Sequence, residues 1–296
     1  MKSIYGMTME KLEEYFLSLG EKKFKATQIY EWIYQKRIKS FDEVTNIKKA
    51  VIDKLKEDFT IDRLDTLKVE RDVEVCKYLF ALNDNERVES VLMRHDYGTS
   101  LCISSQVGCN MGCTFCESGR LKKVRNLNTY EIVEQILLIE KDINLESSEM
   151  VLQILQVEQD IHERISHVVI MGIGEPFDNY DNFVDFIKIV NNPKGIALGS
   201  RHITVSTCGI VPKIKEFASF PLQINLAISL HAPNDEVRNQ IMKINKRYKI
   251  EEVIEAVKEY IKVTNRRITF EYILLKGIND TPKLANQLAD LVKDIN

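Results

Sequence analysis

The sequence lacks the long apolar run that a membrane span needs. No stretch of the 296 residues approaches the roughly eighteen consecutive apolar residues that cross a bilayer. The first residues, MKSIYGMTMEKLEEYF, also lack the apolar core of a signal peptide. Both absences favour a cytoplasmic protein that does not associate with membranes. Because 44% of the residues are hydrophobic, the chain can fold as one large α/β domain with an appendage or as two ordinary domains.

An excess of charge and a dense set of cysteines are missing as well. The formal net charge is −3, so the whole-chain charge does not indicate nucleic acid as a partner, and local patches would have to bind it. Six cysteines are too few and too scattered for the disulfide framework of a small secreted scaffold. We therefore interpret the thiols mainly as ligands or nucleophiles.

The spacing of hydrophobic residues along the sequence divides the chain into three regions. Residues 1–62 have apolar positions at helical spacing and predict a small helical accessory domain. Residues 63–95 alternate apolar and polar side chains and predict a β-hairpin extension. In residues 96–296, short β-branched runs alternate with amphipathic helices, which is typical of a parallel sheet in an α/β fold. Glycine and polar residues follow each run, at the end where parallel barrels hold their active sites.

One segment is nearly repeated. YEIVEQILLIEKDI (130–143) returns as SEMVLQILQVEQDI (148–161), with eight of fourteen positions identical at a shift of 18 residues. Eighteen residues is about five helical turns, so both copies would present the same apolar face. Chance similarity of two amphipathic helices is one explanation; we favour a tandem duplication. Only one copy is then needed on the sheet, and we expect the other to form extra helix or to loop outward.

The segment GCNMGCTFCESG (108–119) holds half of the cysteines. Its glycines permit the tight loop that a cofactor requires. A loop with this spacing can bind three irons of an iron–sulfur cubane, whereas electron-transfer clusters use four cysteines. One iron would stay open to a substrate, as one position does in a catalytic zinc site. A zinc knuckle is the alternative, but it needs four ligands. The three predicted metal ligands are Cys109, Cys113 and Cys116.

The Cys-x3-Cys-x2-Cys loop resembles the signature of the radical S-adenosylmethionine (SAM) superfamily. The motifs NERVESV, LCISSQVGC, MGIGEP, STCGIVP, LAISLHAPND and FEYILLKGIND follow in an order that resembles the RNA adenine C2-methyltransferases of the RlmN/Cfr type. The similarity runs from the N-terminal helices to residue 296. It implies a partial (βα)6 TIM-like barrel over 96–296, a [4Fe–4S] cluster and two SAM molecules per turnover.

The resemblance also implies roles for individual residues. Gly174 and Glu175 would hold the SAM amino group, although a plain glycine turn is the simpler interpretation of MGIGEP. Cys102 would resolve a thioether between enzyme and RNA, and Glu89 would accept a proton. A buried strand cysteine and a solvated glutamate are the ordinary alternatives. A disulfide bond is a further expectation of this family. The residues expected to line the SAM pocket are Ser206, Ser229, Leu230 and His231.

In the family chemistry that the resemblance implies, one SAM methylates a cysteine near the C terminus and a second SAM supplies a radical. The methylene group is then added to adenine C2. No cysteine follows Cys208, and the chain stops before the strand and helix that would precede the methyl-carrying cysteine. We therefore expect a truncated gene product whose barrel lacks its last strand and whose catalysis is impaired. The alternatives are a C8-methylating antibiotic-resistance relative and a non-catalytic RNA-binding remnant.

The implied partners are an adenosine of large-subunit (23S) ribosomal RNA, with transfer RNA as a further candidate, and a reducing electron donor such as flavodoxin. We expect a monomer. Basic side chains that could neutralise RNA phosphates follow the cysteine loop and occur in two other segments, although charge runs are usually solvated faces. These residues are Arg120, Lys122, Lys123, Arg125, Lys36, Arg37, Lys246 and Arg247.

Overall fold

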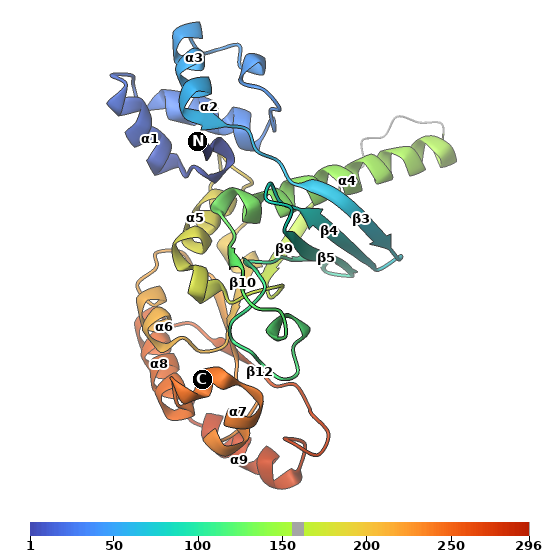
Figure 1. Ribbon diagram of the computed structural model, residues 1–296, viewed down its shortest axis with the longest axis vertical. Helices are drawn as coiled ribbons and strands as arrows, with labels where there is room; N and C mark the ends of the chain where they lie inside the picture. The colour runs from blue at the N-terminus through green and yellow to red at the C-terminus, as the bar shows by residue number, and fades with distance from the viewer. Residues whose placement is uncertain (156–162, 296) are drawn as a thin grey trace. The chain divides into compact units, whose positions relative to one another are not determined.

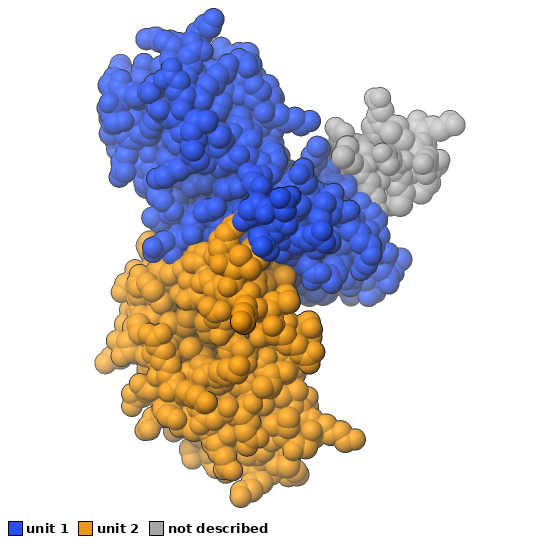
Figure 2. Space-filling model, viewed as in Figure 1, with its two compact units in different colours: residues 1–103, 127–168, 181–199 blue, residues 104–126, 169–180, 200–296 orange. Residues whose placement is uncertain are grey.

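The structure is a computed structural model that describes residues 1–155 and 163–295, with only the backbone described for 145–155 (Figure 1). It divides into two compact units (Figure 2). The first contains residues 1–103, 127–168 and 181–199, and the second contains 104–126, 169–180 and 200–296. The predicted boundaries at residues 62 and 95 both fall inside the first unit. Across the described residues, no helix combines the length and apolarity needed to span a bilayer.

The N-terminal part of the first unit is helical, as predicted. Its elements are β1 (Lys2–Ser3), η1 (Ile4–Gly6), α1 (Met9–Ser18), α2 (Phe24–Tyr34), η2 (Phe41–Glu43), α3 (Lys49–Asp58) and β2 (Phe59–Thr60), with β1 and β2 paired in parallel. Helix α1 begins where the Thr8 hydroxyl accepts a hydrogen bond from the Lys11 N–H, at 3.3 Å. Leu12 and Phe16, four residues apart, bury one face of α1.

The strands of the first unit form a larger sheet than the predicted hairpin. Strands β3 (Asp65–Arg71), β4 (Val75–Ala81), β5 (Arg87–His95) and β6 (Gly98–Cys102) pair antiparallel in the order β6-β5-β4-β3, and β9 (Ile165–Ile170) follows β6. The alternation expected for residues 63–95 is clear in β4, where Cys76, Tyr78 and Phe80 are buried. β3 is mostly exposed, so its sequence carried no such pattern.

Helix α4 (Thr129–Leu155) packs on these antiparallel strands. Its Gln135 accepts a hydrogen bond from Ser90 of β5, and its Asp142 accepts one from Tyr78 of β4, both at 2.8 Å. Residues 130–143, the first repeat copy, lie in this helix and bury its apolar face. Residues 148–155 of the second copy continue the same helix, and 156–161 lie outside the described residues. The predicted arrangement of the two copies therefore stays a prediction.

The second unit contains the predicted parallel strands with helical connections. β10 (Ile203–Thr207), β11 (Asn225–Ser229) and β12 (Ile268–Glu271) pair in parallel in that order. Between and after them lie α6 (Val211–Phe217), α7 (Asp235–Ile241), η6 (Lys243–Lys246), α8 (Ile250–Thr264) and α9 (Pro282–Val292). Figure 1 shows α6 and α8 along the same side of these strands, and the two helices contact each other. The predicted α/β fold class is confirmed.

The remaining elements are short, apart from α5 (Tyr180–Asn191). They are β7 (Gln106–Val107), η3 (Glu117–Gly119), β8 (Arg125–Asn126), η4 (Pro176–Asn179) and η5 (Ser200–His202). β7 and β8 pair antiparallel and flank the cysteine loop, so they fix both of its ends. Gly108, the single residue between Val107 and Cys109, makes the turn into the loop, and its φ of +71° belongs to the left-handed region.

Candidate active site

The cysteine loop closes on itself through its own backbone. The Cys109 N–H donates to the Leu121 carbonyl at 3.1 Å, and the Cys116 N–H donates to the Cys113 carbonyl at 3.3 Å. A Cβ atom on Gly108 would lie 2.2 Å from the Lys122 carbonyl oxygen, so the loop can close this tightly only with glycine there. The geometry thus explains the first glycine of the motif.

Burial and mutual proximity shape the chemistry of these thiols. Burial is the main cause that raises the pKa of Cys109 to about 11 and that of Cys113 to about 12, and the neighbouring thiol groups add to both shifts. Cationic iron would offset the cost of burying a charged thiolate, because the thiolate is the form that binds metal. No disulfide joins any of the six cysteines, all of which are described, so nothing supports the expected disulfide bond.

The donor set suits a cluster that spreads its ligands over several irons. Among the described residues, no three His, Cys, Asp or Glu side chains converge as ligands of one metal ion. A [4Fe–4S] cluster instead takes each thiolate on a different iron. Cys113 and the nearby Phe115 pack against the buried group formed by Cys208, Ala232, Val237, Ile241 and Met242, so the loop has an apolar support.

The MGIGEP segment lies in the same unit. Gly174 has a φ of +112°, and a Cβ atom there would lie 2.6 Å from Cβ of Gln106, so the backbone needs glycine. The Glu175 carboxylate is buried; one oxygen accepts from the Phe177 N–H at 3.0 Å and the other from the Cys208 N–H at 2.7 Å. Burial raises the pKa of Glu175 despite these hydrogen bonds. The turn is therefore structurally required, and the SAM role of both residues stays a prediction.

The carboxyl ends of the parallel strands gather a polar group. The Ser206 hydroxyl of β10 and the Ser229 hydroxyl of β11 both donate to one carboxylate oxygen of Glu271 on β12, at 2.7 and 2.8 Å. The two hydroxyls are 3.2 Å apart. Sequence reasoning named the serines but missed Glu271, and the parallel register that pairs Ser229 with Glu271 is the reason they meet.

His231 and Leu230 follow β11. Both backbone N–H groups donate to the Glu271 carbonyl at 3.1 Å, and the Leu230 side chain is buried. His231 has a φ of +57°; its Nδ1 accepts from the Ile273 N–H at 3.1 Å, and its ring meets Phe115 edge-on, with centroids 4.9 Å apart. Burial lowers the pKa of His231 to about 4 and outweighs the opposing effect of Glu271. The ring is neutral near pH 7 and carries its proton on Nε2.

Sequence reasoning also missed Arg238. This side chain on α7 is fully buried and donates to the carbonyl oxygens of Cys208 at 2.6 Å and Leu230 at 3.1 Å. It thereby holds the chain just after β10 and β11, where the predicted SAM residues lie. An arginine on a short helix ordinarily indicates a solvated surface, so no signal in the sequence marked it.

The two predicted catalytic residues belong to the first unit. Glu89 lies on β5, where it is opposite Leu79 and forms an ion pair with Lys77 at 2.8 Å. Cys102 ends β6, is half-buried and is opposite Val91. Both residues therefore have well-defined strand positions, and their chemical roles stay predictions.

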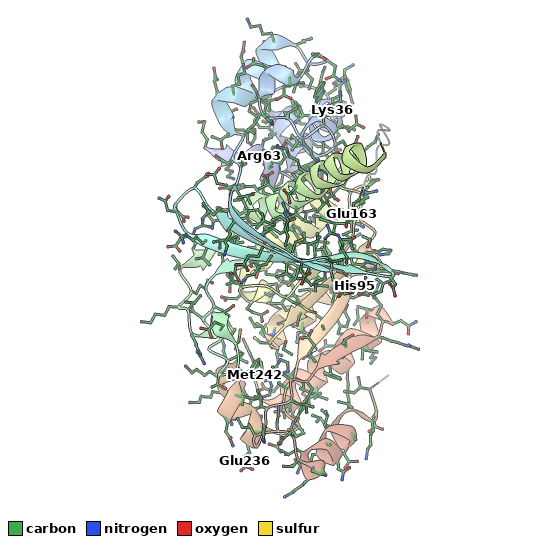
Figure 3. The ribbon with its side chains drawn as sticks, turned by 90° about the vertical axis from the view of Figure 1, so that its right-hand side faces the viewer. Lys36, Arg63, His95, Glu163, Glu236 and Met242 are labelled. Carbon is green, nitrogen blue, oxygen red and sulfur yellow. The ribbon has the colours of Figure 1, made fainter. Side chains whose placement is uncertain are left out.

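Several of the basic residues considered for RNA binding have partners within the chain. Lys123 pairs with Asp178 at 2.7 Å and Arg120 with Glu117 at 3.2 Å. Arg37 forms an ion pair with Glu140, which is buried on α4. Lys36, labelled in Figure 3, lies over the Trp32 ring, 3.4 Å from its centroid. These four basic side chains therefore already interact with acidic or aromatic groups of the protein itself.

Comparison with known proteins gives the family. The model of the "Ribosomal RNA large subunit methyltransferase N-terminal domain" matches residues 2–61, and that of the "Radical SAM superfamily" matches residues 103–286. The "Probable dual-specificity RNA methyltransferase RlmN" of Enterococcus faecalis is 52% identical over 294 residues, which are 99% of this chain and 79% of that protein. The protein of the same name from Lactococcus lactis is 51% identical over 296 residues, 99% of this chain and 78% of that protein.

A solved structure agrees with this relationship. The crystal structure of a radical SAM methyltransferase from Sphaerobacter thermophilus superposes with a TM-score of 0.87 and is 34% identical. The match covers 100% of this chain and 83% of that one. The cysteine loop, the parallel strands and the N-terminal helices all fall within these matches, and the chain belongs to the RlmN family of radical SAM RNA methyltransferases.

Proposed function

We propose that this chain supplies the cluster-binding and SAM-binding parts of an enzyme that methylates C2 of an adenosine in RNA via a methylated cysteine, with SAM as the source of both the methyl group and the radical. The observation that carries the proposal is the loop of Cys109, Cys113 and Cys116, whose segment 108–119 contains no fourth cysteine, in the unit that also holds the polar ends of β10, β11 and β12. Adenine C2 is electron-poor and carries no acidic proton, so ordinary nucleophilic attack on a SAM methyl group is not open to it.

Each group of residues would have one task. The three loop thiolates would hold the [4Fe–4S] cluster, which together with bound SAM supplies a carbon-centred radical able to remove a hydrogen atom. RlmN enzymes use two SAM molecules per turnover. Gly174 and Glu175 would bind the SAM amino group. Ser206, Ser229, Leu230 and His231 would line the SAM pocket, with the neutral His231 offering its Nε2 proton as a donor.

Two residues of the first unit would complete the reaction. The Cys102 thiolate would attack the sulfur of the cysteine that links the enzyme to the base, so that a disulfide forms while the carbon–sulfur bond breaks and the released methylene carbon takes up a proton to become the methyl group. The Glu89 carboxylate would accept a proton. We also propose three functional regions, namely a helical accessory domain (1–62), a β-hairpin extension (63–95) and the radical SAM region (96–296).

The proposed RNA substrates, electron donor and cellular location are inferred from the family. The relatives are named dual-specificity RNA methyltransferases. We infer large-subunit ribosomal RNA and transfer RNA as the substrates, a reducing protein such as flavodoxin as the electron donor, a monomeric enzyme and a cytoplasmic location. The target adenine must leave its stack to reach a protein site.

The test is an anaerobic assay of the 296-residue chain after reconstitution with iron and sulfide. We expect 5′-deoxyadenosine to be released from SAM, and Cys116→Ala to abolish the release while the matched Cys76→Ala retains it. Mass spectrometry of RNA from the same reaction identifies the product. C8-methyladenosine would replace the proposal with the resistance-type activity, and absence of SAM cleavage by the wild type would favour an RNA-binding protein without this chemistry.

A further inference from the structure

A cavity of about 480 Å³ lies beside the cysteine loop, within the second unit. Asn110 and Met111 of the loop line one side. Lys243, Ile244 and Lys246 of η6 and the next residue, Arg247, line the other. The two sides are tied together, because the Thr114 N–H of the loop donates to the Ile241 carbonyl at 2.9 Å, just before η6.

The cavity is positively charged and contains no compensating acid. Lys243, Lys246 and Arg247 are exposed, and no carboxylate in the described part of the chain lies within ion-pair distance of any of them. This distinguishes them from Lys123 and Arg120, which have acidic partners. Three uncompensated cations around one hollow create a local positive potential although the whole chain carries a net charge of −3.

The cations lie on a rigid turn. Asn245, at the centre of η6, is fully buried; its amide donates to Asp235 at 2.7 Å, and its oxygen accepts from Arg238 at 3.1 Å. Met242, labelled in Figure 3, belongs to the buried apolar group at the start of this turn, and Ile244 packs against the same group. The backbone that carries the basic residues on either side of Asn245 is therefore fixed before any ligand arrives, so that binding has to order only their side chains.

Lys243 connects the cavity to the metal-binding loop. A Cβ atom on Gly112 would lie 3.0 Å from Cδ and 3.2 Å from Nζ of Lys243, so this lysine lies directly over the loop, next to Cys113. Gly112 has a φ of +60° and leaves room for the lysine. A group bound by Lys243 would thus be anchored beside the proposed cluster.

We propose that this cavity binds a backbone phosphate of the RNA substrate and so anchors the RNA beside the reaction centre. The inference rests on the proposed function, and it names a contact that the function does not specify. The planar Arg247 guanidinium can bind a phosphate with two hydrogen bonds, and the lysines add point charges. A phosphate is a compact anion that suits a hollow, whereas the acidic face of an electron-donor protein would bring carboxylates spread over a flatter surface.

The test compares two double variants that lose the same charge. The first variant, Lys246→Gln with Arg247→Gln, removes two positive charges from one side of the cavity. The control, Lys258→Gln with Lys262→Gln, removes two positive charges from exposed lysines of α8 in the same unit. Binding of an unmodified transfer RNA transcript to the full chain is measured over a range of salt concentrations. We expect the cavity variant to bind about tenfold or more weakly and its log Kd–log salt slope to fall by about one, as for the loss of one phosphate contact, while the control stays close to wild type.

The outcomes separate this inference from the function on which it rests. Equal weakening in both double variants would overturn the phosphate site, because general charge would then explain the binding. Slower cluster reduction by flavodoxin in the cavity variant, with unchanged RNA binding, would reassign the cavity to the electron donor. If the wild-type chain binds neither this transcript nor a fragment of large-subunit ribosomal RNA, the RNA function itself fails. Iron content and circular dichroism of each variant show whether the loop and the fold are intact.

Discussion

At the scale of single residues, Gly108 controls whether the cysteine loop can form. We predict that Gly108→Ala loses most of its iron after reconstitution, because the new Cβ would meet the Lys122 carbonyl oxygen at 2.2 Å. Gly277→Ala is the matched control: Gly277 has a similar φ of +75° but no atoms within 4 Å of a new Cβ. It carries only the left-handed backbone cost of about 1–2 kcal/mol. Equal iron in the two variants would contradict the prediction.

The protonation of His231 gives a second prediction at this scale. Since burial lowers its pKa to about 4, the ring stays neutral from pH 5.5 to 7.5 and does not change its proposed interaction with SAM. We expect the SAM dissociation constant, measured by equilibrium dialysis, to stay constant over that range and to rise only as the pH approaches 4–5. A midpoint near the ordinary histidine pKa of about 6.5 would show that His231 is more solvated than the structure indicates.

At the scale of elements, Arg238 joins helix α7 to the ends of the parallel strands. Arg238→Met would remove the donor from the Cys208 and Leu230 carbonyl oxygens and leave them buried. We predict a loss of about 2–4 kcal/mol in the free energy of unfolding, measured by urea denaturation, because unsatisfied buried polar groups cost about 1–3 kcal/mol each. Arg201→Met, which loses only an exposed contact with Gln223, should cost less than about 1 kcal/mol. Similar losses in both would refute the role of Arg238.

Elements also explain what the sequence could and could not predict. The parallel strands were predictable because β-branched runs and amphipathic helices alternate, and the thiol loop because its spacing is local. Glu271 was not predictable, since only the β11–β12 register brings it to Ser229. β3 was missed because six of its seven residues are exposed and show no alternation. Local periodicity thus identifies elements, whereas contacts between them depend on register and packing.

At the scale of the whole molecule, the compact units do not follow the order of the sequence. Residues 104–126 leave the first unit to form the cysteine loop, and the chain returns at 127 to build α4. Hydrophobic periodicity carries no information on such returns of the chain, so it could not indicate this division into two units. The first unit is joined internally by ion pairs between the N-terminal region and α4, namely Arg37–Glu140 and Arg63–Glu134, with Arg63 labelled in Figure 3.

The Arg63–Glu134 pair makes global stability depend on pH. Burial raises the pKa of Glu134 from 4.5 to about 7, although Arg63 opposes the shift. At pH values between 4.5 and about 7, the Glu134 carboxyl is mostly protonated in the folded protein but mostly ionised in the unfolded chain. The stabilising contribution is therefore complete below pH 4.5 and is lost as the pH rises through 7, by on the order of 3 kcal/mol.

We therefore predict that wild-type stability falls between pH 4.5 and 7 relative to Glu134→Gln, which cannot titrate at this site. Urea denaturation of both proteins at several pH values gives the difference, in which all other titrating groups largely cancel. Glu131→Gln is the matched control, because Glu131 is a neighbouring buried glutamate on the same helix, where it accepts a hydrogen bond from the Asn128 N–H at 2.7 Å. A wild-type curve parallel to that of Glu134→Gln would mean that Glu134 is ionised in the folded protein throughout this range, and that the ion pair with Arg63 outweighs its burial.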